Sequence, residues 1–192
     1  TALAVMQLVE AGRIDLDAPV TAYLPWFRTN DAAASAQITV RNLLNQNSGL
    51  PTYAGRLGFA DNDQSELALE NGIRDLASVQ LSQPAGQSYE YANDNYNLLG
   101  LIVQSVSGSS YEEYVRSAIF APLQMSHSAA ALSDPAARDI ATGYRYWFFW
   151  PVAFDAPYPR RMTPAGFLIS SAEDMTHYLI AQLNGGTYGN NQ

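Results

Sequence analysis

The sequence contains no cysteine, no lysine and only two histidines among its 192 residues. Without cysteine, the chain can form no disulfide and offers neither a thiol nucleophile nor a thiolate metal site. His127 and His177 are too far apart in the sequence to match a histidine zinc motif, so no metal site is expected. All ten basic residues are arginine, so a mechanism that needs a catalytic lysine cannot be completed within this chain.

Positive charge is scarce, because 10 basic residues face 18 acidic ones and the net charge is −8. A surface of this sign repels phosphate backbones, and we expect no nucleic-acid partner. Hydrophobic residues make up 47% of the chain and charged residues only 15%, which is typical of a folded domain. No apolar run approaches the roughly 20 residues that span a bilayer. Glycine-rich nucleotide motifs and Gly-x-Ser-x-Gly are also absent, and no cofactor is expected.

Helical periodicity dominates the sequence. The clearest helix begins at Asn93, places Leu99 and Ile102 on one apolar stripe, and ends at Gly108. Further helices are expected over residues 1–11, 17–23 (capped by Asp17), 39–46, 65–79, 110–120 and 171–184. Residues 127–131 and 142–149 are expected to be extended, and residues 30–36 and 53–63 to be loops.

Three features outside this pattern allow more than one interpretation. The aromatic run over residues 144–150 is expected to pack over the core, with an apolar substrate wall or a membrane or partner contact as alternatives. Arg160 and Arg161 fit a solvated loop, or a contact with a substrate carboxylate. His177 follows Asp174 by three residues on a helix, which favours a solvated pair, and His127 fits a surface position.

The motif that carries chemistry is Tyr91-Ala92-Asn93, which follows the turn Pro84-Ala85-Gly86 and precedes the helical step Leu98-Leu99-Gly100. It resembles the second active-site motif, Tyr-x-Asn, of class C β-lactamases, penicillin-binding DD-peptidases and related esterases. Three further stretches resemble the same family in the correct order, and they are residues 1–20, 38–51 and 164–175. Many members of this family have His-Thr where this chain has Gln46-Asn47, a change that we expect to be tolerated.

The resemblance implies an α+β, β-lactamase/transpeptidase-like fold, of which residues 1–192 would be the central, mainly helical portion with little strand. The family's Ser-x-x-Lys motif, with its nucleophile, would end just before Thr1. The third motif, a Lys or His followed two residues later by Gly, would lie beyond Gln192. Both chain ends of the fold would therefore be missing from this chain.

The same resemblance assigns roles to four residues. Tyr91 would relay the proton between the serine and the leaving group, and Asn93 would orient the substrate amide and the lysine. The pKa of tyrosine in water is about 10, so the family's tyrosine depends on a nearby cation to accept a proton. Tyr53 would line the substrate side, and Gly166 would allow a close backbone approach to the pocket. Structural roles are also open: a buried aromatic for Tyr91, an N-cap for Asn93, loop packing for Tyr53 and a turn for Gly166.

The resemblance further implies a serine acyl hydrolase that forms an acyl-enzyme without a metal or cofactor and is inactive as this fragment. Its substrate would be a small acyl compound, namely a β-lactam, a D-alanyl peptide or an ester. The alternative is a non-catalytic peptide-binding or interaction module built on the same fold. An extracytoplasmic location is expected for the full-length protein. Helices that normally cover a sheet would expose apolar surface, so self-association is expected as well.

Overall fold

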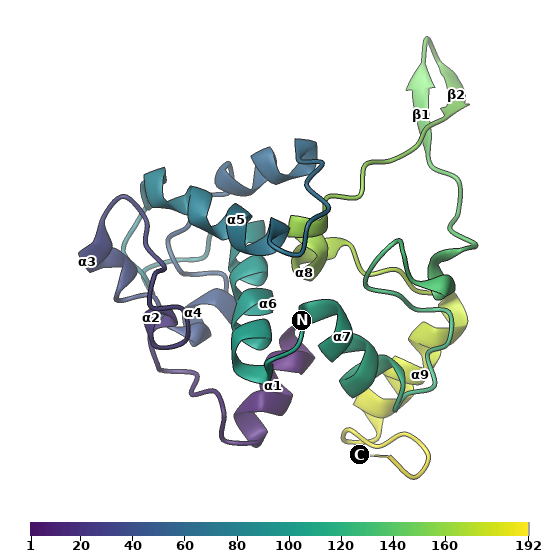
Figure 1. The fold of residues 1–192 in the computed structure, drawn as a ribbon, viewed down its shortest axis with the longest axis horizontal. Coiled ribbons are helices and arrows are strands. Elements are labelled where there is room, and N and C mark those ends of the chain that lie inside the picture. The colour runs from purple at the N-terminus through teal and green to yellow at the C-terminus, as the bar shows by residue number, and fades with distance from the viewer. Residues whose placement is uncertain (192) are drawn as a thin grey trace.

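The computed structural model describes residues 1–191, apart from the side chain of Leu57, and this range is mainly helical (Figure 1). The α-helices are α1 (Ala2–Glu10), α2 (Val20–Tyr23), α3 (Ala32–Ser35), α4 (Val40–Leu44), α5 (Ala68–Arg74), α6 (Asn93–Ser107), α7 (Tyr111–Val115), α8 (Thr163–Gly166) and α9 (Ala172–Leu183). Shorter 3-10 or π turns are η1 (Ala54–Ala60), η2 (Asp75–Ser78), η3 (Arg116–Phe120), η4 (Pro135–Ala137) and η5 (Arg160–Met162). The sheet of the described residues is one antiparallel hairpin, β1 (Tyr144–Trp147) and β2 (Trp150–Ala153). The helix-rich character predicted from the sequence is thus confirmed.

Helix α6 forms the centre of the structure and contacts α1, α2, α4, α5, α7 and α8 (Figure 1). It is buried on more than one side, since Leu98, Leu99, Leu101 and Ile102 are each at most 3% exposed. The middle of α6 is apolar around most of its circumference, as expected for a surrounded helix, whereas its first turns bury the polar residues Asp94, Asn95 and Asn97. Gly100 allows α8 to approach, because a Cβ at this position would overlap the Pro164 ring.

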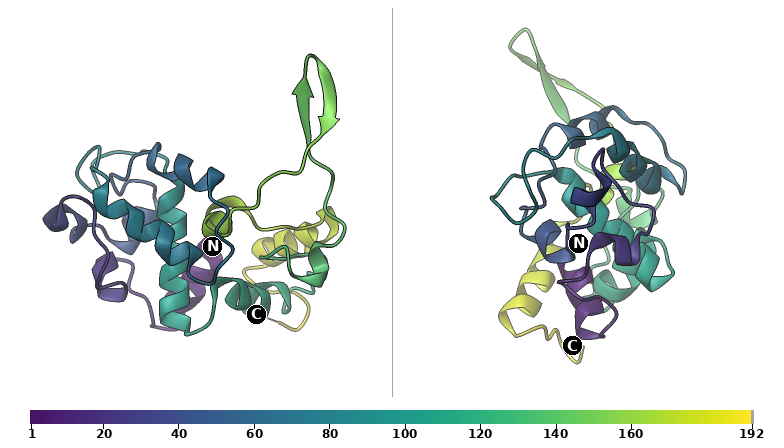
Figure 2. Two further views of the ribbon diagram at one scale, coloured as in Figure 1. Left: turned by 45° about the horizontal axis from the view of Figure 1, so that its top comes forward. Right: turned by 90° about the vertical axis from the view of Figure 1, so that its left-hand side faces the viewer.

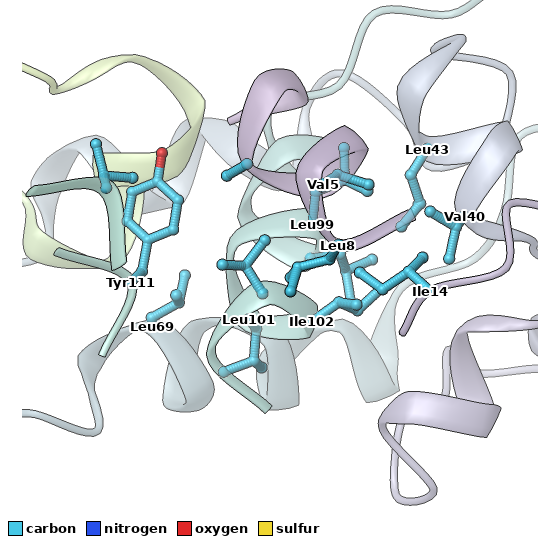
Figure 3. Close-up of a cluster of buried hydrophobic side chains, with 14 of the residues drawn as sticks. Val5, Leu8, Ile14, Val40, Leu43, Leu69, Leu99, Leu101, Ile102 and Tyr111 are labelled. Atoms are coloured by element: carbon cyan, nitrogen blue, oxygen red, sulfur yellow. The ribbon is translucent and has the colours of Figure 1, made fainter. Parts of the chain in front are cut away.

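Apolar side chains from α1, α4, α5 and α7 meet those of α6 (Figure 3). The labelled residues of this core are Val5, Leu8, Ile14, Val40, Leu43, Leu69, Leu99, Leu101, Ile102 and Tyr111. On α6 the predicted stripe of Leu99 and Ile102 is buried. On α1 the helix is confirmed, but Leu3, Met6 and Val9, whose spacing predicted it, are not its buried residues, which are Ala4, Val5 and Leu8. None of the helices described between residues 1 and 191 has the length and apolarity needed to span a bilayer.

The predictions for three local segments need correction. Residues 30–36 are not all loop, because Asp31 accepts hydrogen bonds from the amides of Ala33 and Ala34 and caps α3. Asp17 does not cap α2, since its carboxylate binds Arg41 at 2.7 Å. Residues 53–63 contain the 3-10 turn η1.

Arg160 and Arg161 do not lie in a solvated loop, and neither is available for a substrate carboxylate. Arg161 donates to Asp61 at 3.0 Å and to Asp75 at 3.1 Å, and its side chain is 11% exposed. Gly72 leaves room for this guanidinium, which also donates to the Gly72 carbonyl. Arg161 therefore connects η5 to the segments around α5 and η1. Arg160 donates instead to Glu112 of α7 and to the Gln64 carbonyl, each at 2.9 Å.

The aromatic run does not pack over the core, contrary to the favoured prediction. Residues 144–150 form β1, a two-residue turn and the start of β2, and the hairpin projects away from the helices (Figure 1). The two further views agree, because the hairpin extends beyond the helical body in both (Figure 2). All eight strand residues are exposed.

Helix α9 begins at the predicted cap, where the Ser171 hydroxyl accepts a hydrogen bond from the Asp174 amide. An exposed apolar side of α9 includes Leu179, 54% exposed, and Leu183, 85% exposed. The predicted His177–Asp174 pair does not form. His177 Nδ1 lies 3.0 Å from the Leu123 carbonyl oxygen instead.

Candidate active site

Two loops far apart in the sequence are bonded together ahead of α6. The amide of Ser82 donates to the Gly49 carbonyl at 2.9 Å, and the amide of Gly86 donates to the Asn47 carbonyl at 2.7 Å. Gly49 adopts a left-handed φ of 84°, and a Cβ there would overlap the Gln83 carbonyl oxygen. The segment before Tyr91 is therefore held against residues 46–52 by main-chain contacts.

Gln46 fixes the last part of this junction from a buried position. Its carbonyl accepts from the Glu90 amide at 2.8 Å. Its side-chain Oε1 accepts from the Ala92 amide at 3.0 Å and from Asn95 Nδ2 at 2.5 Å. Gln46 thus holds Glu90 and Ala92, the residues on both sides of Tyr91. The sequence predicted only that Gln46, in place of the family's usual histidine, would be tolerated. Its φ of 56° lies in the left-handed region that is unusual for a residue with a side chain.

Tyr91 and Asn93 stand together at the start of α6. The Tyr91 hydroxyl donates to Asn93 Oδ1 at 2.9 Å, and the Tyr91 side chain is 47% exposed. Tyr91 is therefore not a buried aromatic. Asn93 is the first helical residue and Ala92 occupies the N-cap position, so Asn93 is not the N-cap either. The structural alternatives for both residues are not observed, whereas a phenol and an amide are presented side by side at the surface.

Tyr53 is brought to the same edge of the molecule. The neighbouring Thr52 donates from its hydroxyl to the Tyr91 carbonyl at 2.6 Å and from its amide to Glu90 at 3.1 Å. Gly55 packs against Asn93, because a Cβ at Gly55 would lie 3.0 Å from the Asn93 Cβ. Tyr53 itself is 58% exposed and does not fill the core. Its predicted position beside the Tyr-x-Asn motif is consistent with these contacts.

Gly166 lies at the end of α8 and is exposed. No heavy atom of the described chain lies within 4 Å of the position that a Cβ would occupy there. The close backbone approach predicted at Gly166 therefore has no counterpart among residues 1–191. The close approach to α8 occurs at Gly100 and Pro164 instead.

The start of α1 is anchored next to α8. The Thr1 hydroxyl donates to the Pro164 carbonyl at 2.6 Å and lies 2.6 Å from the Tyr111 hydroxyl. Burial raises the pKa of Tyr111 to about 12, so this phenol is a neutral hydrogen-bonding group at neutral pH. Further along, Arg13 donates to the Val106 carbonyl near the end of α6. Helix α1 therefore runs along α6 in the same direction.

A polar cluster under Asn93 was not predicted from the sequence. Asp94 is 2% exposed, and burial raises the pKa of its carboxyl. Asn97 Nδ2 donates to Asp94 Oδ1 at 3.3 Å and to Met162 Sδ at 3.2 Å. Among the described atoms, Asp94 Oδ2 and Asn97 Oδ1 have no hydrogen-bond partner. The sequence did contain a hint of this cluster, because Asp94 and Asn97 are three residues apart and therefore lie on one side of the predicted helix.

Two buried serines, Ser48 and Ser128, have structural partners. Ser48 is fully buried, and its hydroxyl donates to Asn95 Oδ1 at 2.5 Å. Ser128 donates directly to Asp174 at 2.6 Å, and the backbone amide of His127 donates to the same carboxylate at 2.8 Å. The His127 imidazole lies 3.7 Å from Asp174, but Ser128 contacts this carboxylate directly and not through the ring, so the three residues do not form a Ser-His-Asp relay.

Comparison with known proteins places this chain in one family. The family model described as "Beta-lactamase" matches residues 1–192. Protein flp from Staphylococcus aureus is 31% identical over 184 residues, covering 96% of this chain and 36% of that protein. The putative penicillin-binding protein PbpX from Bacillus subtilis is 29% identical over 187 residues, covering 97% of this chain and 44% of that protein.

A solved structure agrees with the sequence comparison. The D-amino acid amidase from Ochrobactrum anthropi, crystallised with L-phenylalanine amide, has a TM-score of 0.76 and 29% identity. The superposition covers 97% of this chain and 53% of the amidase. The fold is thus that of the serine hydrolases of the β-lactamase/transpeptidase type. The chain belongs to the beta-lactamase family, and it spans between about one third and one half of the length of these relatives.

Proposed function

We propose that this chain supplies one wall of the active site of a serine acyl hydrolase that works through an acyl-enzyme. The observation that carries the proposal is the hydrogen-bonded pair Tyr91 and Asn93, presented at the start of α6 in a chain of the beta-lactamase family. The nucleophile and its partner lysine are proposed to belong to a Ser-x-x-Lys motif that precedes Thr1. A third motif is proposed to follow Gln192. The chain is then the central portion of one catalytic domain.

The direction of α1 supports this arrangement. Helix α1 starts beside Pro164, which packs on Gly100, and it follows α6 toward its C-terminal end. A helix that continued α1 upstream would therefore run along α6 toward Asn93. Gly100 and Asn93 are seven residues apart, which is about 10 Å of helix at about 1.5 Å per residue. Two further turns before Thr1 would bring a serine and a lysine, one turn apart, to the level of Asn93.

In the proposed reaction, the serine Oγ attacks the substrate carbonyl carbon while Tyr91 Oη takes its proton. The adjacent lysine cation stabilises the phenolate form of Tyr91 that accepts this proton. Tyr91 then returns the proton to the leaving nitrogen or oxygen as the bond to the acyl carbon breaks. Water attacks the acyl-enzyme in the second half, and the serine is regenerated as the acid leaves. Asn93 orients the substrate amide and the lysine through its side-chain amide, which both donates and accepts.

The proposed substrate is a small acyl compound: a β-lactam, a D-alanyl peptide, or a short-chain ester or amide. The amidase relative and the penicillin-binding relative support this class, since their names refer to an amide and to penicillin. Tyr53 is proposed to line the substrate side of the pocket, and Gly166 to border it in the complete domain. We also propose an extracytoplasmic location, which cell fractionation with an antibody to this chain would test.

The test compares variants in a longer chain that includes the upstream motif. Tyr91→Phe removes the proton relay and should slow acylation by a penicillin or an activated ester by about 10²–10⁴-fold. Asn93→Ala should slow it by about 10²-fold or more, because a positioned donor is lost. Tyr89→Phe is the matched control, since this phenol is 71% exposed two residues away and should leave the rate unchanged. An equal acylation rate in all three variants would show that Tyr91 and Asn93 take no part in acylation.

A different result would favour a non-catalytic module. If the longer chain forms no acyl-enzyme but binds an acylated D-alanyl-D-alanine peptide, and if Asn93→Ala weakens that binding, the site is a peptide-binding site. Binding is measured by titration calorimetry, and acylation by mass spectrometry on the same samples.

A further inference from the structure

The β1–β2 hairpin is the most exposed apolar feature of the described chain, and it contains none of the residues proposed for the active site. Every residue from Tyr144 to Pro157 is exposed. Exposure reaches 81% at Tyr146 and 94% at Phe149. Both Figure 1 and Figure 2 show the hairpin projecting from the helical body on two long connections. Aromatic side chains displayed in this way are usually contact surfaces.

The pairing register leaves the hairpin without a polar face. Residues directly opposite each other share a face, and the pairs are Tyr144 with Ala153, Arg145 with Val152, Tyr146 with Pro151, and Trp147 with Trp150. One face therefore carries two tyrosines, alanine and proline, and the other carries two tryptophans, valine and one arginine. A hairpin that rests on a protein core normally alternates between an apolar and a polar face. This hairpin is built for apolar surroundings on both sides.

The tip of the hairpin is apolar as well. Phe148 and Phe149 form the two-residue turn, with φ of 45° and 73°. Turns with two positive φ values favour Asn-Gly, because left-handed backbone is costly for residues with large side chains. Two phenylalanines therefore occupy the outermost point of the hairpin despite the backbone cost.

Charge on the hairpin differs from that of the rest of the chain. From Gly143 to Phe154 the only charged residue is Arg145, whose guanidinium lies 5.0 Å from the centre of the Phe154 ring. Carboxylates return at Asp155. The chain as a whole carries −8. Residues 143–154 therefore contain none of the carboxylates that give the chain its negative charge.

We propose that the hairpin inserts into the interfacial layer of a lipid bilayer and anchors the domain at a membrane surface. Two strands of four residues extend about 13 Å at about 3.3 Å per residue, less than half of a hydrocarbon core of about 30 Å. The hairpin therefore reaches the boundary of the acyl chains without crossing them. Phe148 and Phe149 enter the acyl region first, and Trp147, Trp150 and Tyr146 lie at the headgroup level that these amphipathic rings favour.

A lipid surface fits this hairpin better than a protein partner. A protein surface that docks on one face of the hairpin would leave the aromatic rings of the other face in water, so a protein partner would have to enclose the hairpin. A bilayer surrounds both faces and the tip at once. Because the single cation contributes little, insertion into neutral lipid is expected to be sufficient.

The test is flotation of the 192-residue chain with phosphatidylcholine vesicles, with and without phosphatidylglycerol. The chain should float with both kinds of vesicle. The double variant Phe148→Ser with Phe149→Ser should reduce the partition constant at least about tenfold, because full burial of one large apolar side chain is worth more than that factor. The matched control is Leu67→Ser with Leu132→Ser, which removes two exposed leucines outside the hairpin and α9 and should leave the partition constant unchanged.

Three outcomes would overturn the proposal. The first is no flotation of the parent chain, and the second is equal flotation of the Phe148/Phe149 variant. The third is an equal loss in the Leu67/Leu132 control, which would indicate non-specific adsorption. If the Phe148/Phe149 variant instead abolishes concentration-dependent sedimentation without any vesicle binding, the hairpin contacts a second copy of the chain and the lipid proposal is wrong.

Discussion

The buried side chain of Gln46 offers a direct test of how the Tyr-x-Asn motif is positioned. Gln46→Ala removes the acceptor of two buried donors, the amide of Ala92 and Nδ2 of Asn95. Both residues are fully buried. Each donor left without a partner costs about 1–3 kcal/mol. We therefore expect the free energy of unfolding to fall by about 2–4 kcal/mol, since partial relaxation offsets part of the loss.

Two further variants separate the causes. Gln46→Gly also loses the acceptor but relieves the left-handed backbone, so it should be about 0.5–1 kcal/mol more stable than Gln46→Ala. Asn95→Ala combined with Gln46→Ala removes donor and acceptor together. The double variant should cost less than the sum of the single variants by about 1 kcal/mol or more.

The assay is urea unfolding followed by far-UV circular dichroism, with Gln80→Ala as the control. Gln80 is exposed, and its replacement should change the free energy of unfolding by less than about 0.5 kcal/mol. A loss below about 0.5 kcal/mol for Gln46→Ala, or strict additivity with Asn95→Ala, would refute the view that this side chain connects the two loops.

Three other perturbations have defined outcomes. Asp94→Asn should raise the melting temperature at neutral pH, because burial raises the pKa of Asp94 and the unfolded chain therefore ionises first as the pH rises above 3.8. Below that pH the gain should vanish, and a gain independent of pH would contradict the assignment. Arg161→Ala should cost about 2–3 kcal/mol by urea unfolding, since it leaves Asp61 without its cation; a loss under about 1 kcal/mol would refute its connecting role. The exposed side of α9 should drive self-association, which Leu179→Ser with Leu183→Ser should reduce in sedimentation velocity, and a monomeric parent chain would contradict this.

Much of the helical framework was predictable because it follows from side-chain spacing and end residues. The stripe of Leu99 and Ile102, the left-handed Gly108 with φ of 79°, and the caps at Ser110 and Ser171 are each visible in the structure. These signals are local, so the sequence alone contains them. The family resemblance of the Tyr-x-Asn segment is likewise confirmed by the family match over residues 1–192.

The errors concern choices that depend on distant partners. Asp17 is a residue type that often caps helices, but in the fold its carboxylate binds Arg41 instead. Arg161 was expected in solvent because nothing local shows that Asp61 and Asp75 converge on it. The aromatic run was expected in the core because apolar residues usually are. The hairpin is exposed because none of the described elements covers it.

The candidate site also contains residues that a local motif predicted and residues that only the structure reveals. Tyr91 was selected from a motif, and its neighbours from the chain order of that motif. Gln46 was not selected because its side chain contacts Ala92, 46 residues away, which a linear pattern does not reveal. Asp94 was not selected because its burial depends on distant segments, such as Met162, which accepts from the neighbouring Asn97. The roles of Tyr53 and Gly166 stay predictions.

The most direct test of the central claim is intact mass spectrometry after incubation with a penicillin and with an activated ester. It is applied to the 192-residue chain and to a longer chain that includes the proposed upstream Ser-x-x-Lys motif. We expect a covalent acyl adduct on the longer chain alone, mapped by peptide digestion to the serine of that motif. An adduct on the 192-residue chain would contradict the account, because Ser48 and Ser128 are bonded to Asn95 and Asp174 and should be unreactive. No adduct on either chain would contradict the proposed acyl-enzyme.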